Sequence, residues 1–220
     1  MRDKARTIKR SKPLRDLCPS DDMDVAEQAS RLSFSTPSQT HLSLADGKYH
    51  LLAADLSDTA CVGKVLTDAG IDTTAPTLLL AECVLVYLEP VASSRLLHWA
   101  SQTFQEAVFV SYDMIGFGDK YGKMMFNNLL RAGCHIPGFE AYPTVESQRE
   151  RYLQAGWGGA KVCDMLMAYD LLVASGERTR VSKVEILDEL EEWCLIMSHY
   201  CLLVAANGPH SLQFLGSLPI

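Results

Sequence analysis

A run of ten almost entirely apolar residues, 77–86, constrains the fold of this chain more than any other feature of its sequence. The run reads Thr-Leu-Leu-Leu-Ala-Glu-Cys-Val-Leu-Val; Pro76 precedes it, and Pro90 follows shortly after it. An apolar run without alternation is typical of a strand that is covered on both faces in a parallel sheet. We therefore expect a buried central strand with helices packed on either side of it.

Apolar runs alternate with helical patterns along the chain after residue 48. The expected strands are 49–54, 77–86, 107–112, 159–162 and 200–206, and the expected helices begin near Asp58, Pro90, Asp119, Thr144, Asp164 and Val184. In the last helix, apolar residues at helical spacing are expected to face the core, among them Ile186, Leu187 and Leu190. Such alternation predicts a doubly wound α/β sheet, in which ligands bind beyond the carboxyl ends of the strands.

Three regions are expected along the chain. Residues 1–47 are poor in periodic apolar residues, so we expect a basic helix followed by a flexible loop. Residues 48–208 form the globular part, and residues 209–220 form a tail. The basic side chains at the start are Arg2, Lys4, Arg6, Lys9, Arg10, Lys12 and Arg15. Such a run is more often a solvated helix or tail than a nucleic-acid or targeting segment.

Composition narrows the classes of function. The chain has 220 residues, 48% of them apolar, which is enough for one core, and its formal net charge of −7 argues against a broad surface for nucleic acid or anionic lipid. Its seven cysteines include no CxxC pair, which indicates reduced thiols of a cytosolic protein. No apolar stretch reaches the roughly 18 residues of a membrane span. We expect a cytoplasmic protein without a nucleic-acid or membrane partner.

Several motifs that carry chemistry are missing from the sequence. There is no GxxxxGK[ST] or GxGxxG phosphate loop, since Gly122 comes one position too late after Gly116 and Gly118. There is no GxSxG nucleophile elbow. The six histidines show neither HExxH nor another cluster at ligand spacing, so no metal site is expected. No catalytic nucleophile is indicated either.

Acidic residues at the ends of expected strands remain as candidates. Asp55 follows the strand 49–54, where its carboxylate can cap the next turn or bind a ligand amine, and the cap is the favoured interpretation. Glu82 lies inside the apolar run, where an unpaired carboxylate would cost several kcal/mol. Its partner could be a ligand cation or a Lys or Arg of the protein, and the sequence leaves both interpretations open.

The stretch 79–90, Leu-Leu-Ala-Glu-Cys-Val-Leu-Val-Tyr-Leu-Glu-Pro, resembles the motif after the fourth strand of the leucine carboxyl methyltransferase family. This family methylates the carboxyl-terminal leucine of the protein phosphatase 2A catalytic subunit. The resemblance extends over about 49–208, and further segments in family order are 53–56, 118–122, 146–151, Gly156-Trp157 and 199–201. It implies an S-adenosylmethionine-dependent, Rossmann-like methyltransferase sheet.

The resemblance also implies roles for individual residues. Asp55 and Leu56 would hold the adenine end of S-adenosylmethionine, Glu82 would lie against its methionine portion, and Tyr87 would face the substrate. Ser57 stands where relatives carry an arginine suited to a substrate carboxylate. A peptide α-carboxyl group has a pKa near 3.5, so it is ionised at neutral pH and needs no catalytic base. The implied partner is the phosphatase catalytic subunit.

The sheet order implied by the resemblance is 3-2-1-4-5-7-6, and no glycine turn typical of strand 1 precedes Asp55. We therefore expect an amino-terminally truncated form that lacks its first two strands, with little or no activity and with unpaired edges on strands 49–54 and 77–86. The alternative is a non-catalytic fragment that at most binds the phosphatase. A tRNA wybutosine methyltransferase is less favoured, because those relatives continue into repeat modules.

Overall fold

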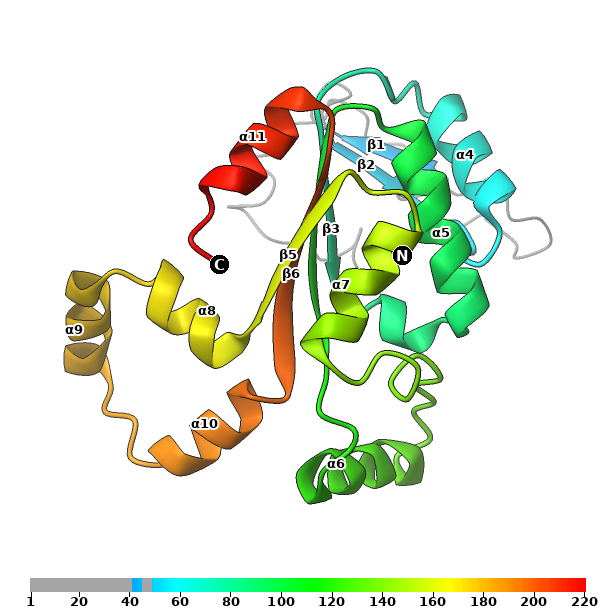
Figure 1. Cartoon of the computed structure of the whole chain (residues 1–220). Helices are drawn as coiled ribbons and strands as arrows, with labels where there is room; N and C mark the ends of the chain where they lie inside the picture. Colours follow the sequence, from blue (N-terminus) through cyan, green and yellow to red (C-terminus); the bar gives the residue numbers. More distant parts are fainter. Residues whose placement is uncertain (1–40, 45–48) are drawn as a thin grey trace. The chain divides into compact units, whose positions relative to one another are not determined.

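The computed structural model describes residues 41–44 and 49–220 of the chain (Figure 1). The chain divides into two compact units, Met1–Asp72 and Thr73–Ile220. In the first unit the described elements are strands β1 (His41–Leu44) and β2 (Tyr49–Leu52) and helix α4 (Thr59–Asp68). Helix α4 begins as expected, because the Asp58 carboxylate accepts a hydrogen bond from the Cys61 N–H at 3.1 Å.

The strand expected at 49–54 is shorter and has a different partner from the one predicted. It ends at Leu52 and pairs antiparallel with β1, not within a parallel sheet. In the sequence, the dipeptide Asp46-Gly47 between the two strands is typical of hairpin turns. The rest of the basic helix and loop expected at 1–47 lies outside the described residues.

Four strands form the sheet of the second unit: β3 (Thr77–Glu82), β4 (Ala107–Met114), β5 (Gly159–Asp164) and β6 (Tyr200–Asn207). Their order is β3-β4-β6-β5, with β3 parallel to β4 and β6 antiparallel to both of its neighbours. This order confirms the 4-5-7-6 part of the sheet implied by the resemblance. Within the described residues, no strand pairs with the outer edge of β3.

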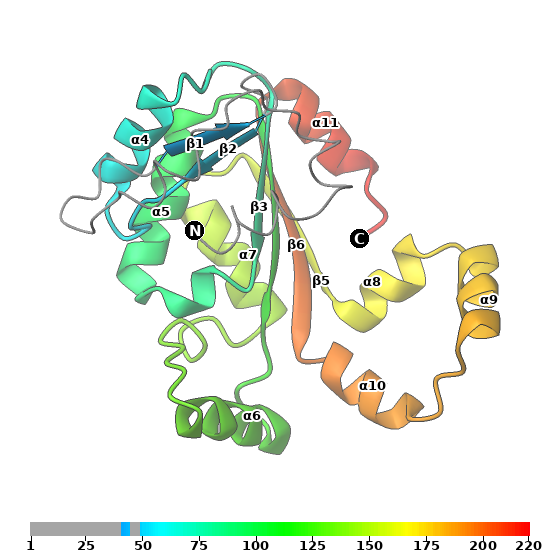
Figure 2. The same cartoon turned by 180° about the vertical axis from the view of Figure 1, so that it is seen from behind.

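Helices cover both faces of this sheet. The helices of this unit are α5 (Pro90–Thr103), α6 (Lys120–Arg131), α7 (Val145–Gln154), α8 (Met165–Leu172), α9 (Ser175–Val184), α10 (Leu190–Met197) and α11 (Pro209–Ser217). Figures 1 and 2 show α5 and α7 on one side of the sheet and α8 and α11 on the other. The expected tail thus contains a helix, α11, whose Leu215 packs against Val204 and Ala206 of β6. None of the described helices has the length and apolarity that crossing a membrane requires.

An aromatic cluster holds α5 and α7 against the sheet. The ring of Phe109 on β4 packs edge-to-face on Tyr152 of α7, at 5.3 Å between centroids, and on Trp157, at 5.6 Å. The indole N–H of Trp157 donates a hydrogen bond to the carbonyl of Leu97 in α5 at 3.2 Å. The side chains of Leu97 and Tyr152 are fully buried.

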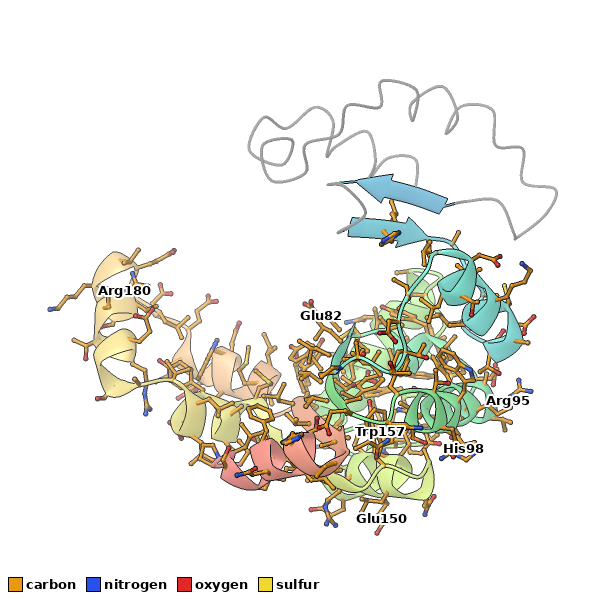
Figure 3. All side chains as sticks on the ribbon, turned by 90° about the horizontal axis from the view of Figure 1, so that it is seen from above. Glu82, Arg95, His98, Glu150, Trp157 and Arg180 are labelled. Atoms are coloured by element: carbon orange, nitrogen blue, oxygen red, sulfur yellow. The ribbon has the colours of Figure 1, made fainter. Side chains whose placement is uncertain are left out.

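The prediction of one helix from Val184 to about residue 197 was wrong, both in the extent of the helix and in the burial of its apolar residues. Helix α9 ends at Val184, α10 begins only at Leu190, and Ile186 between them is 82% exposed. Leu187 and Leu190 are exposed as well. The helical spacing of apolar residues is present, but in the described structure it has no surface to pack on. Figure 3 shows α9, with Arg180, at the opposite end of the unit from α5, with Arg95 and His98.

Candidate functional site

The carboxyl ends of β3 and β4 lie side by side, which is where the fold class places ligands. Glu82 is the register partner of Tyr112, and the Cys83 N–H donates a hydrogen bond to the Tyr112 carbonyl at 2.8 Å. Strand β3 ends at Glu82, although the apolar run continues to residue 86. The remaining apolar residues form the 3₁₀ helix η2 (Leu85–Tyr87), in which Leu85 and Val86 are buried. The ten-residue strand that we expected is thus six residues long.

Cys83 makes the turn that ends β3. Its φ of 48° lies in the left-handed region, and it is the one described residue other than glycine with a positive φ. Burial raises the pKa of its thiol to about 11, and the negative charges of Asp113 and Glu82 add to the effect. The thiol is therefore protonated at neutral pH. A strained residue at the ligand-binding edge of a sheet is a pointer to function.

Glu82 is the last residue of β3, but its surroundings differ from those expected. Its side chain is exposed, because β3 alternates and its last residue points away from the covered face. Leu78 and Leu80, on the same face, are 68% and 70% exposed, so the strand is not covered on both faces as predicted. Within the described residues the Glu82 carboxylate has no hydrogen-bond or ion-pair partner. The sequence left two partners open for Glu82, a ligand cation or a Lys or Arg of the protein. No Lys or Arg among the described residues pairs with it.

Aromatic side chains surround this edge of the sheet. The rings of Tyr112 and Tyr200 stack at 5.1 Å with an interplanar angle of 6°. Burial raises the pKa of Tyr112 to about 12, and Tyr200 adds to the effect. Tyr87, at the end of η2, is 46% exposed; its pKa is raised by burial first and then by the Cys134 thiol. All three hydroxyls remain protonated at neutral pH. The strand-end rule indicates Tyr112, and Tyr200 lies in the segment 199–201, which contributes to the family resemblance.

Asp55 and Leu56 belong to the first unit, whereas Glu82 and Tyr87 belong to the second. The Asp55 Oδ1 atom accepts hydrogen bonds from the N–H of Ser57 at 2.9 Å and from its hydroxyl at 2.7 Å. These bonds lower the pKa of Asp55. The favoured interpretation of Asp55 as a turn cap is confirmed. Its second oxygen, Oδ2, stays open to another donor.

Two charged side chains, Asp113 of β4 and Arg151 of α7, are buried in the core. Asp113 is 3% exposed and Arg151 of α7 is 4% exposed. Burial raises the pKa of Asp113 to about 6, while the Met114 N–H and the charge of Arg151 oppose the rise. The Arg151 guanidinium lies 4.2 Å from the centroid of the Tyr142 ring, and its Nε and Nη2 have no hydrogen-bond acceptor among the described residues. The strand-end rule indicates Asp113, but no sequence signal indicated that Arg151 lies near it.

A histidine fixes helix α6 beyond the ends of the strands. His199 is buried; its Nε2 lies 3.0 Å from the Asp119 carboxylate and its Nδ1 lies 2.7 Å from the Leu195 carbonyl. Asp119 also accepts the Gly122 N–H at 2.7 Å, as the expected cap of α6, and this bond and His199 lower its pKa. Gly116 leaves no room for a Cβ, which would lie 2.5 Å from the His199 ring. The ring therefore joins the start of β6 to the start of α6.

Several known proteins are similar in sequence to this chain. The family model described as leucine carboxyl methyltransferase matches residues 19–101. Bovine leucine carboxyl methyltransferase 1 is 41% identical over 165 residues, which are 75% of this chain and 49% of that protein. The Arabidopsis thaliana homolog is 35% identical over 188 residues, 83% of this chain and 57% of that protein. Rat tRNA wybutosine-synthesizing protein 4 is 42% identical over 171 residues, 78% of this chain and 25% of that protein.

Among solved structures, "PigF with SAH" matches with a TM-score of 0.38 and 13% identity, over 68% of this chain and 40% of that chain. The chain spans about half the length of the leucine carboxyl methyltransferases that it matches, and about a quarter of the wybutosine-synthesizing proteins. The matched family segment includes Asp55, Glu82 and Tyr87. On these sequence matches, the chain belongs to the leucine carboxyl methyltransferase family.

Proposed function

We propose that this chain takes part in the S-adenosylmethionine-dependent methylation of a carboxyl-terminal leucine, and that the substrate is the protein phosphatase 2A catalytic subunit. Family membership supports the reaction class. The observation that carries the proposal is the exposed Glu82 carboxylate, which has no partner among the described residues and follows the covered part of β3. We place the reaction in the cytoplasm, because the six described cysteines are free thiols and suit a reducing compartment.

The residues present suit the methyl donor. The Glu82 carboxylate would bind the ammonium group of its methionine portion, and an open carboxylate at a strand end has the right charge for that contact. Asp55 and Leu56 would hold the adenine end, with Asp55 Oδ2 as the acceptor that Ser57 leaves unused. The donor, when bound, supplies the sulfonium methyl group that is transferred.

The chain's own part in the reaction is to position the substrate. The leucine carboxylate is already ionised at neutral pH, so no residue needs to remove a proton and none is assigned as catalytic. Tyr87 is exposed and keeps its proton, because its pKa is raised, so its hydroxyl would donate a hydrogen bond to the substrate carboxylate. Holding that carboxylate in line with the methyl group, roughly 3 Å away, would supply most of the rate.

Glu82→Gln tests the cofactor site. The substitution keeps the shape of the side chain but removes its charge, so we expect S-adenosylmethionine to bind about tenfold more weakly in calorimetry. Glu150→Gln is the matched control, because Glu150 is an exposed carboxylate on α7, away from Glu82 (Figure 3). Equal loss in both variants would contradict the role of Glu82.

A radiolabelled methyl-transfer assay, paired with a phosphatase pull-down, tests the reaction. We expect a base-labile label on the phosphatase catalytic subunit that disappears when its terminal leucine is deleted. Pull-down without transfer would support the alternative of a non-catalytic protein that binds the phosphatase. The match to rat tRNA wybutosine-synthesizing protein 4 supports a second candidate, so tRNA forms a separate arm of the assay. Label on tRNA alone would overturn the protein substrate.

A further inference from the structure

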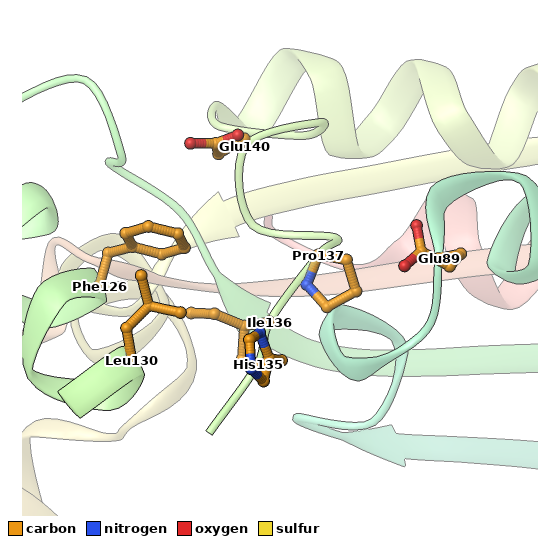
Figure 4. Close-up of a pocket in the computed structure, with 7 residues that line it drawn as sticks. All are labelled: Glu89, Phe126, Leu130, His135, Ile136, Pro137 and Glu140. Atoms are coloured by element: carbon orange, nitrogen blue, oxygen red, sulfur yellow. The ribbon is translucent and has the colours of Figure 1, made fainter. Parts of the chain in front are cut away.

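A pocket of about 230 Å³ lies between α6 and the loop that follows it. Phe126 and Leu130 of α6 and Ile136 and Pro137 of the loop form its apolar walls (Figure 4). Two carboxylates, from Glu89 and Glu140, also line it. It belongs entirely to the second unit of the chain.

The loop wall of the pocket is fixed to the motif that follows β3. The Gly138 N–H donates a hydrogen bond to the Val86 carbonyl at 3.0 Å, and a Cβ on Gly138 would lie 3.0 Å from the Val86 Cα. Ile136 and Phe139 are buried in one cluster with Val86. The pocket is therefore preformed, and a ligand would not need to order the loop.

The carboxylates of Glu89 and Glu140 give the pocket a negative charge. Neither the Glu89 nor the Glu140 carboxylate has an ion-pair or hydrogen-bond partner among the described residues, and both are exposed. No lysine or arginine lines the pocket; the remaining ionisable group there is His135, which is exposed. A ligand with an apolar body and a positively charged end would complement both the walls and the carboxylates.

We propose that this pocket binds an arginine or lysine side chain of the protein substrate. Its methylene stem would pack on Phe126 and Ile136, and its charged end would meet the carboxylates of Glu89 and Glu140. Glu89 lies two residues after Tyr87 in the sequence. His135 directly follows Cys134, whose side chain forms a hydrogen bond with the Tyr87 hydroxyl. The pocket therefore adjoins the residue assigned to the substrate. The proposal rests on the proposed function, because it requires a protein substrate.

Three labelled hexapeptide amides test the proposal by fluorescence anisotropy with the full chain. They share the sequence Ala-Ala-X-Ala-Ala-Leu, where X is arginine, the neutral isostere citrulline, or glutamate. We expect the arginine peptide to bind about tenfold more tightly than the citrulline peptide, and the glutamate peptide to bind most weakly. The terminal amide removes the carboxylate that would be methylated, so this readout does not depend on methyl transfer.

Variants of the chain test whether the peptides bind in this pocket. The double variant Glu89→Gln, Glu140→Gln should abolish the difference between the arginine and citrulline peptides, and Phe126→Ala should weaken both peptides alike. Glu192→Gln, an exposed carboxylate on α10, is the control and should leave the difference intact. Equal affinity of the wild-type chain for the two peptides would overturn the proposal. So would a preference for arginine that survives in the double variant.

Discussion

The backbone of Cys83 shows how one residue shapes the candidate site. A left-handed conformation costs a residue with a side chain about 1–2 kcal/mol, yet the chain adopts it at the carboxyl end of β3. The turn takes Leu85 and Val86 out of the strand and buries them in η2. It also leaves Glu82 as the last residue of the strand, with its carboxylate exposed.

Position 83 should reverse the usual order of alanine and glycine. In helices glycine is about 1 kcal/mol less stable than alanine, but at a positive φ glycine avoids the steric cost. We therefore expect Cys83→Gly to be more stable than Cys83→Ala by about 1 kcal/mol in urea unfolding. The same two substitutions at Cys194, inside α10, should show the opposite order. Alanine as the more stable variant at both positions would contradict the strain at Cys83.

Single residues of the site could be predicted only in part. Asp55 was correctly interpreted as a turn cap, because the interaction is local and its partner, Ser57, is two residues away. Glu82 belongs to a strand, as the apolar run predicts, but its predicted burial was wrong, since the run of residues could not reveal a turn at Cys83. The proximity of Arg151 to Asp113 could not be predicted, because the position of α7 relative to β4 is set by the tertiary fold.

At the scale of elements, the turn between β4 and α6 depends on close backbone packing. A Cβ on Gly122 would lie 2.1 Å from the Gly116 carbonyl oxygen, whereas a Cβ on Gly118 would meet nothing within 4 Å. The same turn holds Asp119 against His199. Helix α6, which supplies one wall of the pocket, is therefore positioned by this glycine pair.

Gly122→Ala should loosen α6, while Gly118→Ala should not. The first substitution forces backbone atoms apart and is expected to cost about 1–3 kcal/mol, or a few degrees in melting temperature. The second, in the same turn, should stay within about 0.5 kcal/mol of the wild type. Differential scanning calorimetry on the two variants gives the comparison. Similar melting temperatures for both would mean that the turn tolerates the added methyl group.

Elements with local signals were predicted well. The caps at Asp58, Asp119, Thr144 and Asp164 all accept the expected backbone hydrogen bonds, because a cap depends on residues only three positions apart. Elements without such signals were not. The helix predicted from Val184 had no cap residue at its start, and the apolar spacing alone could not show that α10 begins six residues later.

At the scale of the whole molecule, the exposed face of β3 predicts self-association. Leu78 and Leu80 are about two-thirds exposed, and within the described part of the chain the outer edge of β3 has no partner strand. Residues 77–81 of this edge strand carry no charge, and an apolar edge favours pairing with another copy. We expect Leu80→Lys to shift the chain toward the monomer in sedimentation velocity. Val91→Lys, at a residue of similar exposure on α5, should change little.

Strand β6 is the last strand in the sequence, but it lies between β4 and β5 in the sheet. In the described structure β5 pairs only with β6. It therefore cannot gain backbone partners until residues 200–207, which form β6, have been synthesised. The order of assembly therefore differs from the order of synthesis. Domains generally fold as units as the chain leaves the ribosome. In a nascent chain that stops before Tyr200, β3 and β4 can pair with each other, but β5 has no strand to pair with.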